Sequence, residues 1–511
     1  MRVQCLILIT VLHWSMCVQH REFYSSTGQL IKLLGVGRDL VKNLTDYITA
    51  EEAILENLKR VLPELSAVTA GVGSADELEE HVSDPLTAYR LVRTLRSKWT
   101  MVEEILEGSP LPEFQTVVKL NSQSLPTDRD EDGIALGLLR LQDTYQLMPQ
   151  SIMGRGQLGL VDVESFGPNE TFHIAMIAYK HQKFSLYMSW MLETLRQLDL
   201  GPLSASLLRM DTLPVAHSFI QQLLSQDRTE IQVMLQQMYH TSLQQGFLQG
   251  VDHSDIDLLT HRSSFNRTYE ALCRGQGIRM PPERQKRLFC RYTRGGGSVQ
   301  HLYAPFKEQD EWDTPRIVRY VDLMSDKEID IIKKLSRPKL ERALVMDLKT
   351  GNKFSTESRV SKSAWLSSEE DPAIDKLNRR MSDATGLDMT AAETLQVANY
   401  GIGGQYEPHF DSKLANDPDL ALKGNRIATI LIYMSDVRLG GSTVFPDVGA
   451  ELTPQKGSAV LWYNMLRNGL EDDRTLHAAC PVFVGSKWVA NKWVRERGQE
   501  FRRRCSLSPT E

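Results

Sequence analysis

Hydrophobic residues recur at heptad spacing near the N-terminus, from about residue 30 to residue 61. One row of the repeat consists of Leu33, Leu40, Tyr47, Ile54 and Val61, and the other of Leu30, Leu44, Leu58 and Leu65. Two apolar rows at this spacing predict a long amphipathic helix that pairs with a second copy of itself. A helix that packs inside its own domain would show the same few heptads, so both arrangements stay open at this point.

Further helical patterns follow this first stretch. We expect a second helix from about residue 85 to residue 106, a loop over residues 109–132, and helices again over residues 169–248, where glycine is scarce. Tyr179, Tyr187 and Trp190 fall near one face, because positions three apart are neighbours on a helix surface. An aromatic stripe of this kind is more often core than a binding groove.

The C-terminal part of the chain has a different pattern. A helix predicted over Ser325–Leu335 precedes short strand-like segments that glycine and proline separate. The predicted strands are Thr394–Tyr400, Arg426–Met434, Ser442–Phe445, Gly457–Tyr463 and Trp488–Val494. This succession favours an all-β jelly roll. The polar loop over residues 412–425 is a candidate lid.

Length and charge limit the class of protein. The chain has 511 residues, too many for one core, and we expect two to four domains. Its net charge of −6 combines similar numbers of acidic and basic residues, which gives no indication of nucleic-acid binding. Residues 1–19 read as a secretory signal peptide, with cleavage around Cys17 to Gln19. No later segment is apolar enough to predict a membrane span, so we expect a mature protein that is soluble in the secretory pathway.

The cysteines and the glycosylation sequons also agree with the secretory pathway. Four cysteines lie beyond the signal peptide, which allows three disulfide pairings, and proximity favours Cys273–Cys290 together with Cys480–Cys505. An oxidising compartment makes bridged cysteines the expected state, with free buried thiols as the alternative. Asn43, Asn169 and Asn266 begin N-x-T sequons and are candidate glycosylation sites.

A candidate metal site stands out in the C-terminal part. His409 and Asp411 are two positions apart and would share one face of a strand, and His477 is the only other histidine after His301. Two imidazoles and one carboxylate suit ferrous iron in oxygen chemistry. Taken alone, an H-x-D tripeptide is more often an ordinary strand histidine with a hydrogen-bonded neighbour.

The flanking residues favour the metal interpretation. The glycine-rich turn between Tyr400 and Tyr406 leads into the predicted strand, and no helix follows that would make it a phosphate loop. Iron with this donor set keeps a positive charge, which favours an anionic 2-oxo acid as a chelating ligand. A second carboxylate on that acid would need a cation, and Lys487 is the candidate, although a lone lysine is more often solvated.

Longer stretches resemble a known family. These are QVANYGIGGQYEPHFD (Gln396–Asp411), NRIATILIYMSDV, GGSTVFP and HAACPVFVGSKWVANKWVRERGQEFRR. They resemble the catalytic α subunit of collagen prolyl 4-hydroxylase, and a weaker similarity reaches the N-terminus. The resemblance implies a dioxygenase that uses Fe(II) and 2-oxoglutarate on a double-stranded β-helix.

The resemblance also implies roles for individual residues. His409, Asp411 and His477 occupy the iron-ligand positions, and Lys487 occupies that of the 2-oxoglutarate-anchoring lysine. By similarity, Tyr400 and Thr429 line the cosubstrate pocket, and Trp493 borders the substrate or belongs to the core. The family supports the same disulfide pairing and uses L-ascorbate to rescue over-oxidised iron.

The implied fold class is a multidomain α+β protein. After the signal peptide, a helical dimerisation domain covers residues 20–150, and a tetratricopeptide-like peptide-binding domain covers residues 160–248. There Tyr179, Tyr187 and Trp190 would line a groove for proline-rich peptides. A linker with a disulfide (residues 249–311) leads to the catalytic domain (residues 312–511). The family implies protein disulfide isomerase as the β subunit of an α2β2 tetramer, and the lumen of the endoplasmic reticulum as the location.

This chain departs from the family pattern at two places. Arg495 stands where vertebrate enzymes carry a histidine near the cosubstrate, and an arginine can still present positive charge to a carboxylate but does not titrate near neutral pH. Residues 210–227 include Pro214 and no tyrosine, where the family has a tyrosine-rich helix. Both changes predict altered cosubstrate or peptide preference.

The sequence therefore predicts a procollagen-proline 4-dioxygenase α subunit that hydroxylates peptidyl proline at C4. Two alternatives stay open. One is a non-catalytic subunit of the endoplasmic reticulum that only binds proline-rich peptides. The other is a prolyl hydroxylase whose substrates are non-collagen secreted proteins.

Overall fold

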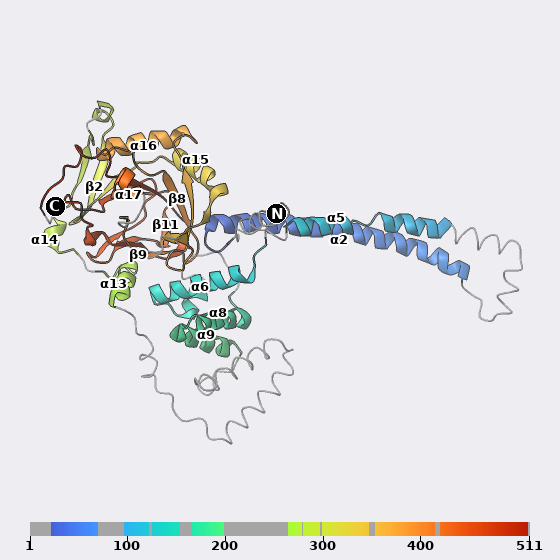
Figure 1. The fold of residues 1–511 in the computed structure, drawn as a ribbon. Coiled ribbons are helices and arrows are strands. Elements are labelled where there is room, and N and C mark those ends of the chain that lie inside the picture. Colours follow the sequence, from blue (N-terminus) through green and yellow to red (C-terminus); the bar gives the residue numbers. More distant parts are fainter. Residues whose placement is uncertain are drawn as a thin grey trace, which may run out of the picture. The chain divides into compact units, whose positions relative to one another are not determined.

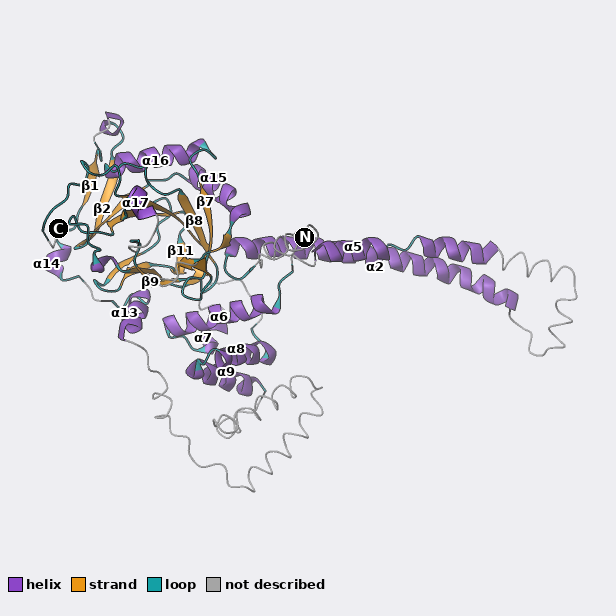
Figure 2. Cartoon of the chain, viewed as in Figure 1, coloured by secondary structure: helices purple, strands orange, loops and turns teal. Residues whose placement is uncertain are grey.

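The structure is a computed structural model of the full chain, and its helices and strands are shown in Figures 1 and 2. It describes residues 22–69, 97–121, 125–153, 165–198, 264–277, 280–296, 299–346, 353–413 and 419–508. The chain forms two compact units, one of residues 1–21 and 30–127 and the other of residues 22–29 and 128–511. Most of the predicted peptide-binding region, including residues 210–227 and Pro214, lies outside the described residues.

The first unit is helical, as the heptads predict. Helix α2 (Thr27–Thr69) spans the whole heptad region, residues 97–107 are helical, and α5 (Leu111–Asn121) follows. Tyr47 of α2 stacks on Phe114 of α5 with 4.8 Å between ring centroids. A third apolar row of α2 stays exposed in this single chain; it consists of Leu34, Val41, Ile48, Leu55 and Leu62.

The predicted loop over residues 109–132 is wrong. It contains all of α5 and the start of α6 (Asp128–Tyr145). The polar residues that indicated a loop, Asp128, Asp130 and Glu131, form the first turn of α6. Acidic side chains are favourable there, because the amide groups at a helix N-terminus carry partial positive charge.

Four helices of the second unit pack around one apolar cluster. They are α6, α7 (Pro149–Met153), α8 (Pro168–Lys180) and α9 (Phe184–Gln197). Leu139 of α6, Ile174 of α8 and Met191 of α9 are buried together in this cluster. Helix α6 thus packs with α8 and α9, although the predicted boundary assigns it to the preceding domain.

The rest of the second unit is built on two antiparallel sheets (Figure 2). The large sheet has the order β1 (Cys290–Thr293), β2 (Phe306–Asp313), β3 (Arg316–Val321), β14 (Ala459–Tyr463), β10 (Arg426–Tyr433), β17 (Lys487–Arg495), β8 (Leu395–Tyr400), β7 (Lys362–Leu366) and β4 (Glu341–Arg342). The smaller sheet has the order β13 (Ala450–Leu452), β12 (Thr443–Phe445), β15 (His477–Ala479) and β9 (Tyr406–His409). Two further pairs are β11 (Val437–Gly440) with β16 (Val482–Gly485), and β5 (Val345–Met346) with β6 (Lys353–Phe354).

Each face of the large sheet has its own core. One face packs against α15 (Asp326–Ser336) and α16 (Pro372–Thr385), through residues such as Ile332 and Leu377. The opposite face meets the smaller sheet, where Val460 and Leu431 pack with Phe445. This arrangement leaves the space between the two sheets for the candidate site.

The predicted strands of this region agree with β8, β10, β12, β14 and β17, and the predicted helix with α15. Ser325 caps α15 by accepting a hydrogen bond from the Glu328 amide, which explains where the helix begins. The predicted domain boundary at residue 312 falls inside β2, because β1 and β2 already pair in the large sheet.

The predicted disulfide pairing is wrong. Cys273, at the end of α13 (Ser264–Cys273), is bonded to Cys480, with 5.5 Å between their Cα atoms. Cys290 and Cys505 are exposed free cysteines. Proximity in sequence failed because α13 packs on β12 and β15, where Leu272 and Ala478 share an apolar cluster. Among the described residues, no helix has the length and apolar character to cross a bilayer.

Candidate active site

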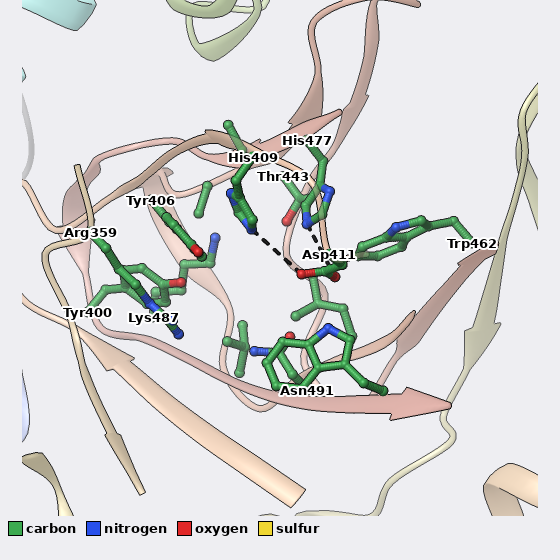
Figure 3. Close-up of a pocket in the computed structure, with 15 residues that line it drawn as sticks. Arg359, Tyr400, Tyr406, His409, Asp411, Thr443, Trp462, His477, Lys487 and Asn491 are labelled. Atoms are coloured by element: carbon green, nitrogen blue, oxygen red, sulfur yellow. Dashed lines mark ion pairs between the residues drawn. The ribbon is translucent and has the colours of Figure 1, made fainter. Parts of the chain in front are cut away.

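The two predicted histidine ligands lie opposite each other in the smaller sheet. His409 ends β9, His477 begins β15, and the two residues are direct partners in the antiparallel register. Asp411 follows two residues after β9 and points between the rings (Figure 3). One ligand atom from each of the three side chains lies within 4.8 Å of the others, so the structure brings the predicted triad together.

Backbone carbonyls orient both imidazoles. The Nδ1 of His409 lies 2.8 Å from the Glu407 carbonyl, and the Nδ1 of His477 lies 2.9 Å from the Thr475 carbonyl. A carbonyl only accepts, so each Nδ1 carries the proton and each Nε2 keeps its lone pair. The Nε2 atoms of His409 and His477 face Asp411 at 3.8 and 3.5 Å. This is the tautomer that a metal ligand requires.

Asp411 has its own supporting contacts. The Thr429 hydroxyl, on β10, donates to Asp411 Oδ2 at 2.6 Å. Asn464 in turn donates from Nδ2 to the Thr429 oxygen at 2.9 Å. Thr429 therefore lies beneath the Asp411 carboxylate, and its role in the cosubstrate pocket stays a prediction. Its hydroxyl supports the candidate metal site through Asp411.

The protonation states also suit a cation. Burial and the neighbouring His477 lower the pKa of His409. Burial by itself raises the pKa of Asp411, but the two imidazoles lower it by more, so this pKa stays below its usual value. Both shifts leave neutral imidazole beside ionised carboxylate at neutral pH. Metal binding requires these forms, since ligands must be deprotonated. The donor set suits ferrous iron.

Lys487 lies at the other end of the same pocket (Figure 3). It is 2% exposed, and its ammonium lies 5.2 Å from the centroid of the Tyr400 ring. No carboxylate of a described residue pairs with it, and burial lowers its pKa from 10.5 to about 7. A buried lysine without an anionic partner is costly, which indicates that the pocket receives an anion. Burial raises the pKa of Tyr400 to about 12, so its hydroxyl stays protonated.

One strand supplies much of the pocket wall. Lys487, Val489, Asn491 and Trp493 alternate along β17 and line the pocket, while Trp488, Ala490 and Val494 face the opposite core. The indole N–H of Trp493 has no hydrogen-bond acceptor among the described residues. The guanidinium of Arg426 lies 3.9 Å from the Trp493 ring. Trp493 thus lines the pocket, and its contact with the substrate stays a prediction.

Several pocket residues were missed in the sequence. They are Arg359, Tyr406, Leu431, Thr443, Trp462, Ala478, Ala479, Val489 and Asn491. The period-two alternation from Lys487 would have identified Asn491, which shares the lysine's face. Nothing in the local pattern marks Arg359, which comes from a loop before β7 and stacks over Tyr406 at 4.5 Å.

Arg495 does not present its charge to the pocket, which corrects the prediction from its position. It is 1% exposed, pairs with Glu393 at 2.8 Å and donates from Nη1 to the Gly424 carbonyl at 2.9 Å. It is not among the lining residues. The Glu393 carboxylate holds the Arg495 guanidinium in this position and also accepts two hydrogen bonds from Arg426.

The three aromatic residues predicted for peptide binding occupy a different environment. Tyr187 and Trp190 are completely buried in the cluster of α6, α8 and α9, and the Trp190 indole donates to Gln142 at 2.6 Å. The alternative that they belong to the core therefore holds, and the groove prediction is wrong for both. Only Tyr179 is partly exposed; it packs against Tyr187 with 5.4 Å between ring centroids.

The glycine-rich turn between β8 and β9 is a packing point. A Cβ on Gly403 would lie 2.4 Å from the Gly137 carbonyl oxygen of α6, and φ at Gly403 is +63°. Arg140 of α6 donates to the Gly403 carbonyl at 2.6 Å. Glycine is needed here because another backbone comes close. In the predicted lid, α17 (Asp419–Lys423) is helical and residues 414–418 lie outside the described part.

Comparisons with known proteins agree with this geometry. Residues 26–158 match the family model described as prolyl 4-hydroxylase alpha-subunit, N-terminal region, and residues 395–495 match the 2OG-Fe(II) oxygenase superfamily. The second match contains both histidines, Asp411 and Lys487.

Three curated relatives match along almost the whole chain. Prolyl 4-hydroxylase subunit alpha-2 of Gallus gallus is 43% identical over 95% of this chain and 95% of its own length. Prolyl 4-hydroxylase subunit alpha-1 is 41% identical in Rattus norvegicus, over 97% of each chain, and 41% identical in Homo sapiens, over 99% of each chain. Similarity at this level and coverage extends to both units of the structure.

Proposed function

This chain belongs to the prolyl 4-hydroxylase α-subunit family, and from that premise we propose which of its residues carry out the hydroxylation of peptidyl proline at C4. The protein is a dioxygenase that uses Fe(II) and 2-oxoglutarate. The observation that carries the assignment of residues is a single pocket with a His-Asp-His cluster at one end and, at the other, a buried lysine that no carboxylate of the described residues pairs with.

His409, Asp411 and His477 hold the iron. Their Nε2 and carboxylate atoms converge. The Glu407 and Thr475 carbonyls orient His409 and His477, and the Thr429 hydroxyl donates to Asp411. The bound iron and 2-oxoglutarate together supply the oxidation of the proline C4–H bond by O2, with release of succinate and CO2. The protein supplies the ligand geometry and a pocket walled by Trp462, Leu431 and Val489 that limits water.

Lys487 receives the distal carboxylate of 2-oxoglutarate. Its ammonium would gain the anionic partner that it lacks, and this ion pair would form where water is largely excluded. The Tyr400 ring lies 5.2 Å from the ammonium, and its protonated hydroxyl would donate a second hydrogen bond to the same carboxylate. A neutral ligand of the same shape would leave the buried ammonium unpaired, so the pocket selects a dicarboxylate.

The peptide approaches on the Trp493 side of the cluster. The Trp493 ring lines the pocket beside the cluster, and we propose that this ring borders the bound peptide. Arg426 holds the ring in place from the other side. We propose collagen-like chains as the substrate class, and the assay below compares them with other proline-rich peptides.

For assembly, we propose an α2β2 tetramer in which protein disulfide isomerase is the β subunit. The exposed row from Leu34 to Leu62 on α2 supports pairing of two α subunits, because it repeats every seven residues as a dimer seam does. The peptide-binding region would be a tetratricopeptide-like array, of which α8 and α9 are described, and the facing sheets would form a double-stranded β-helix, or jelly roll.

We also propose the lumen of the endoplasmic reticulum as the location. The signal-like residues 1–19 and the Cys273–Cys480 disulfide support an oxidising compartment. Asn169 is exposed and Asn43 partly exposed, as glycan acceptors must be, whereas the Asn266 side chain lies outside the described structure. L-Ascorbate would serve as the reductant that restores iron(II).

A decarboxylation assay tests this function. The purified α subunit, co-expressed with its β subunit, is incubated with Fe(II), ascorbate and 2-oxoglutarate, and a panel of proline-rich peptides is added. We expect succinate formation that depends on peptide and is abolished in His409→Ala and in His477→Ala, with assembly intact. Full activity in either variant would remove the iron assignment. Peptide binding without succinate formation by the native chain would favour a non-catalytic subunit.

A further inference from the structure

The segment directly after the predicted signal peptide is buried in the catalytic unit. Residues 22–26 are each less than a tenth exposed, and Ser25 and Ser26 are completely buried. Chain termini are usually exposed and poorly fixed unless specific contacts hold them. Cleavage around Cys17 to Gln19 would place this segment close to the N-terminus of the mature protein.

Backbone contacts hold the segment on the glycine-rich turn. The Gly401 amide donates to the Ser25 carbonyl at 3.1 Å, and the Phe23 amide donates to Asp130 at 2.7 Å. A Cβ on Gly401 would lie 2.2 Å from the Tyr24 carbonyl oxygen, so the segment occupies the space that any other side chain would need. The turn after β8 is thus shaped to receive this part of the chain.

The side chain of Asn399 connects the segment to Lys487. Its Oδ1 accepts hydrogen bonds from the Ser26 hydroxyl at 2.6 Å and from the Gly28 amide at 3.1 Å. Its Nδ2 donates to the Lys487 carbonyl at 3.1 Å. Asn399 is completely buried, so these bonds are not replaced by water when they break.

A second contact reaches the residue before Lys487. The Thr27 and Ser486 hydroxyl oxygens lie 2.6 Å apart, and the Ser435 hydroxyl donates to the Ser486 carbonyl at 2.6 Å. Lys487 begins β17 and pairs with Tyr400 of β8, whereas pairing of β17 with β10 reaches only Val489. One side of the Lys487 backbone therefore lacks a strand partner, and the segment supports it through Asn399 and Ser486.

We propose that Asn399 is a positioning residue for 2-oxoglutarate, and that residues 22–28 act through it to fix the backbone from which Lys487 reaches the pocket. This proposal rests on the function proposed above for Lys487. The N-terminal segment then contributes to 2-oxoglutarate binding by fixing the position of Lys487. The lysine needs such support because its ammonium must meet a carboxylate at a set distance, and a shift of its backbone moves the charge.

Variants of the segment test the proposal in the full chain with its β subunit. Ser26→Ala with Thr27→Val removes two hydroxyls and leaves every pocket side chain unchanged. Ser26→Ala with Thr27→Ser keeps the hydroxyl at position 27 and removes only that of Ser26. Thr49→Val is the matched control, because the Thr49 hydroxyl on the same helix donates only to the Thr45 carbonyl at an exposed position.

We expect the double variant to weaken 2-oxoglutarate binding by about three- to tenfold, the effect of losing one or two buried hydrogen bonds. Calorimetry with Mn(II) in place of iron measures this without turnover. The KM for peptide and the kcat at saturating 2-oxoglutarate should stay near native values. Hydrogen exchange in the metal-free protein should be faster across Ser486–Val489. Ser26→Ala with Thr27→Ser should fall between the native protein and the Ser26→Ala/Thr27→Val variant, and Thr49→Val should match the native protein.

Two results would overturn the proposal. One is a folded double variant that binds 2-oxoglutarate as tightly as the native protein and exchanges Ser486–Val489 at the native rate. The other is an equal loss of kcat and of both affinities together with a lower melting temperature, which would mean a general structural role. If the native chain bound no 2-oxoglutarate, the proposed function would fail, while the exchange measurement would still report on the link to Lys487.

Discussion

Thr429 Oγ1 donates a hydrogen bond to Asp411 Oδ2 at 2.6 Å, in a part of the site where both residues are buried. The bond joins the middle of β10 to the carboxylate that stands between two imidazoles. Asn464 holds the hydroxyl from behind at 2.9 Å, so its proton points to the carboxylate. The chain from Asn464 through Thr429 to Asp411 therefore fixes which carboxylate oxygen stays available to a metal.

The first prediction follows from this chain. Thr429→Val keeps the shape of the side chain and removes the hydroxyl. We expect the affinity for Fe(II) to fall by about 10- to 100-fold, as is typical when a ligand loses its supporting hydrogen bond. Excess Fe(II) should restore most of the kcat. Titration of Mn(II) by electron paramagnetic resonance measures the affinity directly, and Thr429→Ser should retain native binding. Native metal affinity in the valine variant would show that Asp411 needs no such support.

A second prediction concerns the pH dependence of 2-oxoglutarate binding. Burial lowers the pKa of Lys487 to about 7, so the ammonium is present below pH 7 and is lost as the pH rises through that value. Binding of the dicarboxylate needs the ammonium, so above pH 7 it must take up a proton. Affinity should therefore fall by about tenfold per pH unit from pH 7 to pH 9.

Calorimetry at pH 8 in buffers of different ionisation enthalpy checks this uptake. We expect close to one proton taken up per bound 2-oxoglutarate in the native protein. Lys487→Arg should bind more weakly but with little pH dependence over the same range, since an arginine stays charged. Equal pH dependence in both proteins would assign the titration to another group.

A third prediction separates stability from function at the same residue. The unfolded chain holds the Lys487 proton up to about pH 10, whereas the folded chain releases it near pH 7. The folded state thus binds fewer protons between these values, and its stability rises with pH in this window. Lys487→Met removes the buried amine, and we expect it to stabilise the ligand-free protein at pH 7 by on the order of 3 kcal/mol. Thermal melts at pH 7 and pH 9 measure the effect, and 2-oxoglutarate binding should be lost. A lower melting temperature at pH 7 would contradict the prediction.

The fourth prediction concerns the disulfide. Cys273 and Cys480 join α13 to the end of the strand that carries His477. Cys273→Ala with Cys480→Ala should reduce the free energy of unfolding by about 2 to 5 kcal/mol, the usual cost of losing a native disulfide. Cys290→Ser is the control and should melt like the native protein, because Cys290 is exposed and unbridged. Peptide mapping without reduction identifies the bond, and a Cys273–Cys290 peptide would restore the pairing that the sequence predicted.

The sequence predicted the strands of the iron site and the long helix α2 well, because their signals are local. The spacing of His409 and Asp411, the strand pattern of β17 and the heptads of α2 each depend on neighbours within a few residues. Period-two and period-seven patterns follow directly from strand and helix geometry. The loop prediction over residues 109–132 failed for a local reason too, since acidic residues favour both loops and first helical turns.

The features that the sequence missed depend on contacts between distant segments. The Cys273–Cys480 bond spans 207 residues, and Arg359 and Asn399 gain their roles only when loops and strands far apart meet. Tyr187 and Trp190 show the same limit, because helical spacing places them on one face but does not say whether that face meets solvent or α6. Likewise, the position of Arg495 indicated the pocket, whereas its actual partner, Glu393, comes from before β8.

The last prediction concerns Arg495, for which the sequence predicted a charge near the cosubstrate. Its guanidinium pairs with Glu393 and its Nη1 holds the Gly424 carbonyl, so it fixes the end of the candidate lid and does not line the pocket. Arg495→His leaves Glu393 with Arg426 alone and the carbonyl without its donor. We expect a loss of about 1 to 3 kcal/mol in the free energy of unfolding, with 2-oxoglutarate affinity near native. Arg497→His is the matched control, because Arg497 donates to the Leu422 carbonyl of the same loop at an exposed position. Thermal melts and calorimetry separate the two effects. A large change in 2-oxoglutarate affinity at unchanged stability would show that Arg495 acts on the cosubstrate, as its position in the sequence predicted.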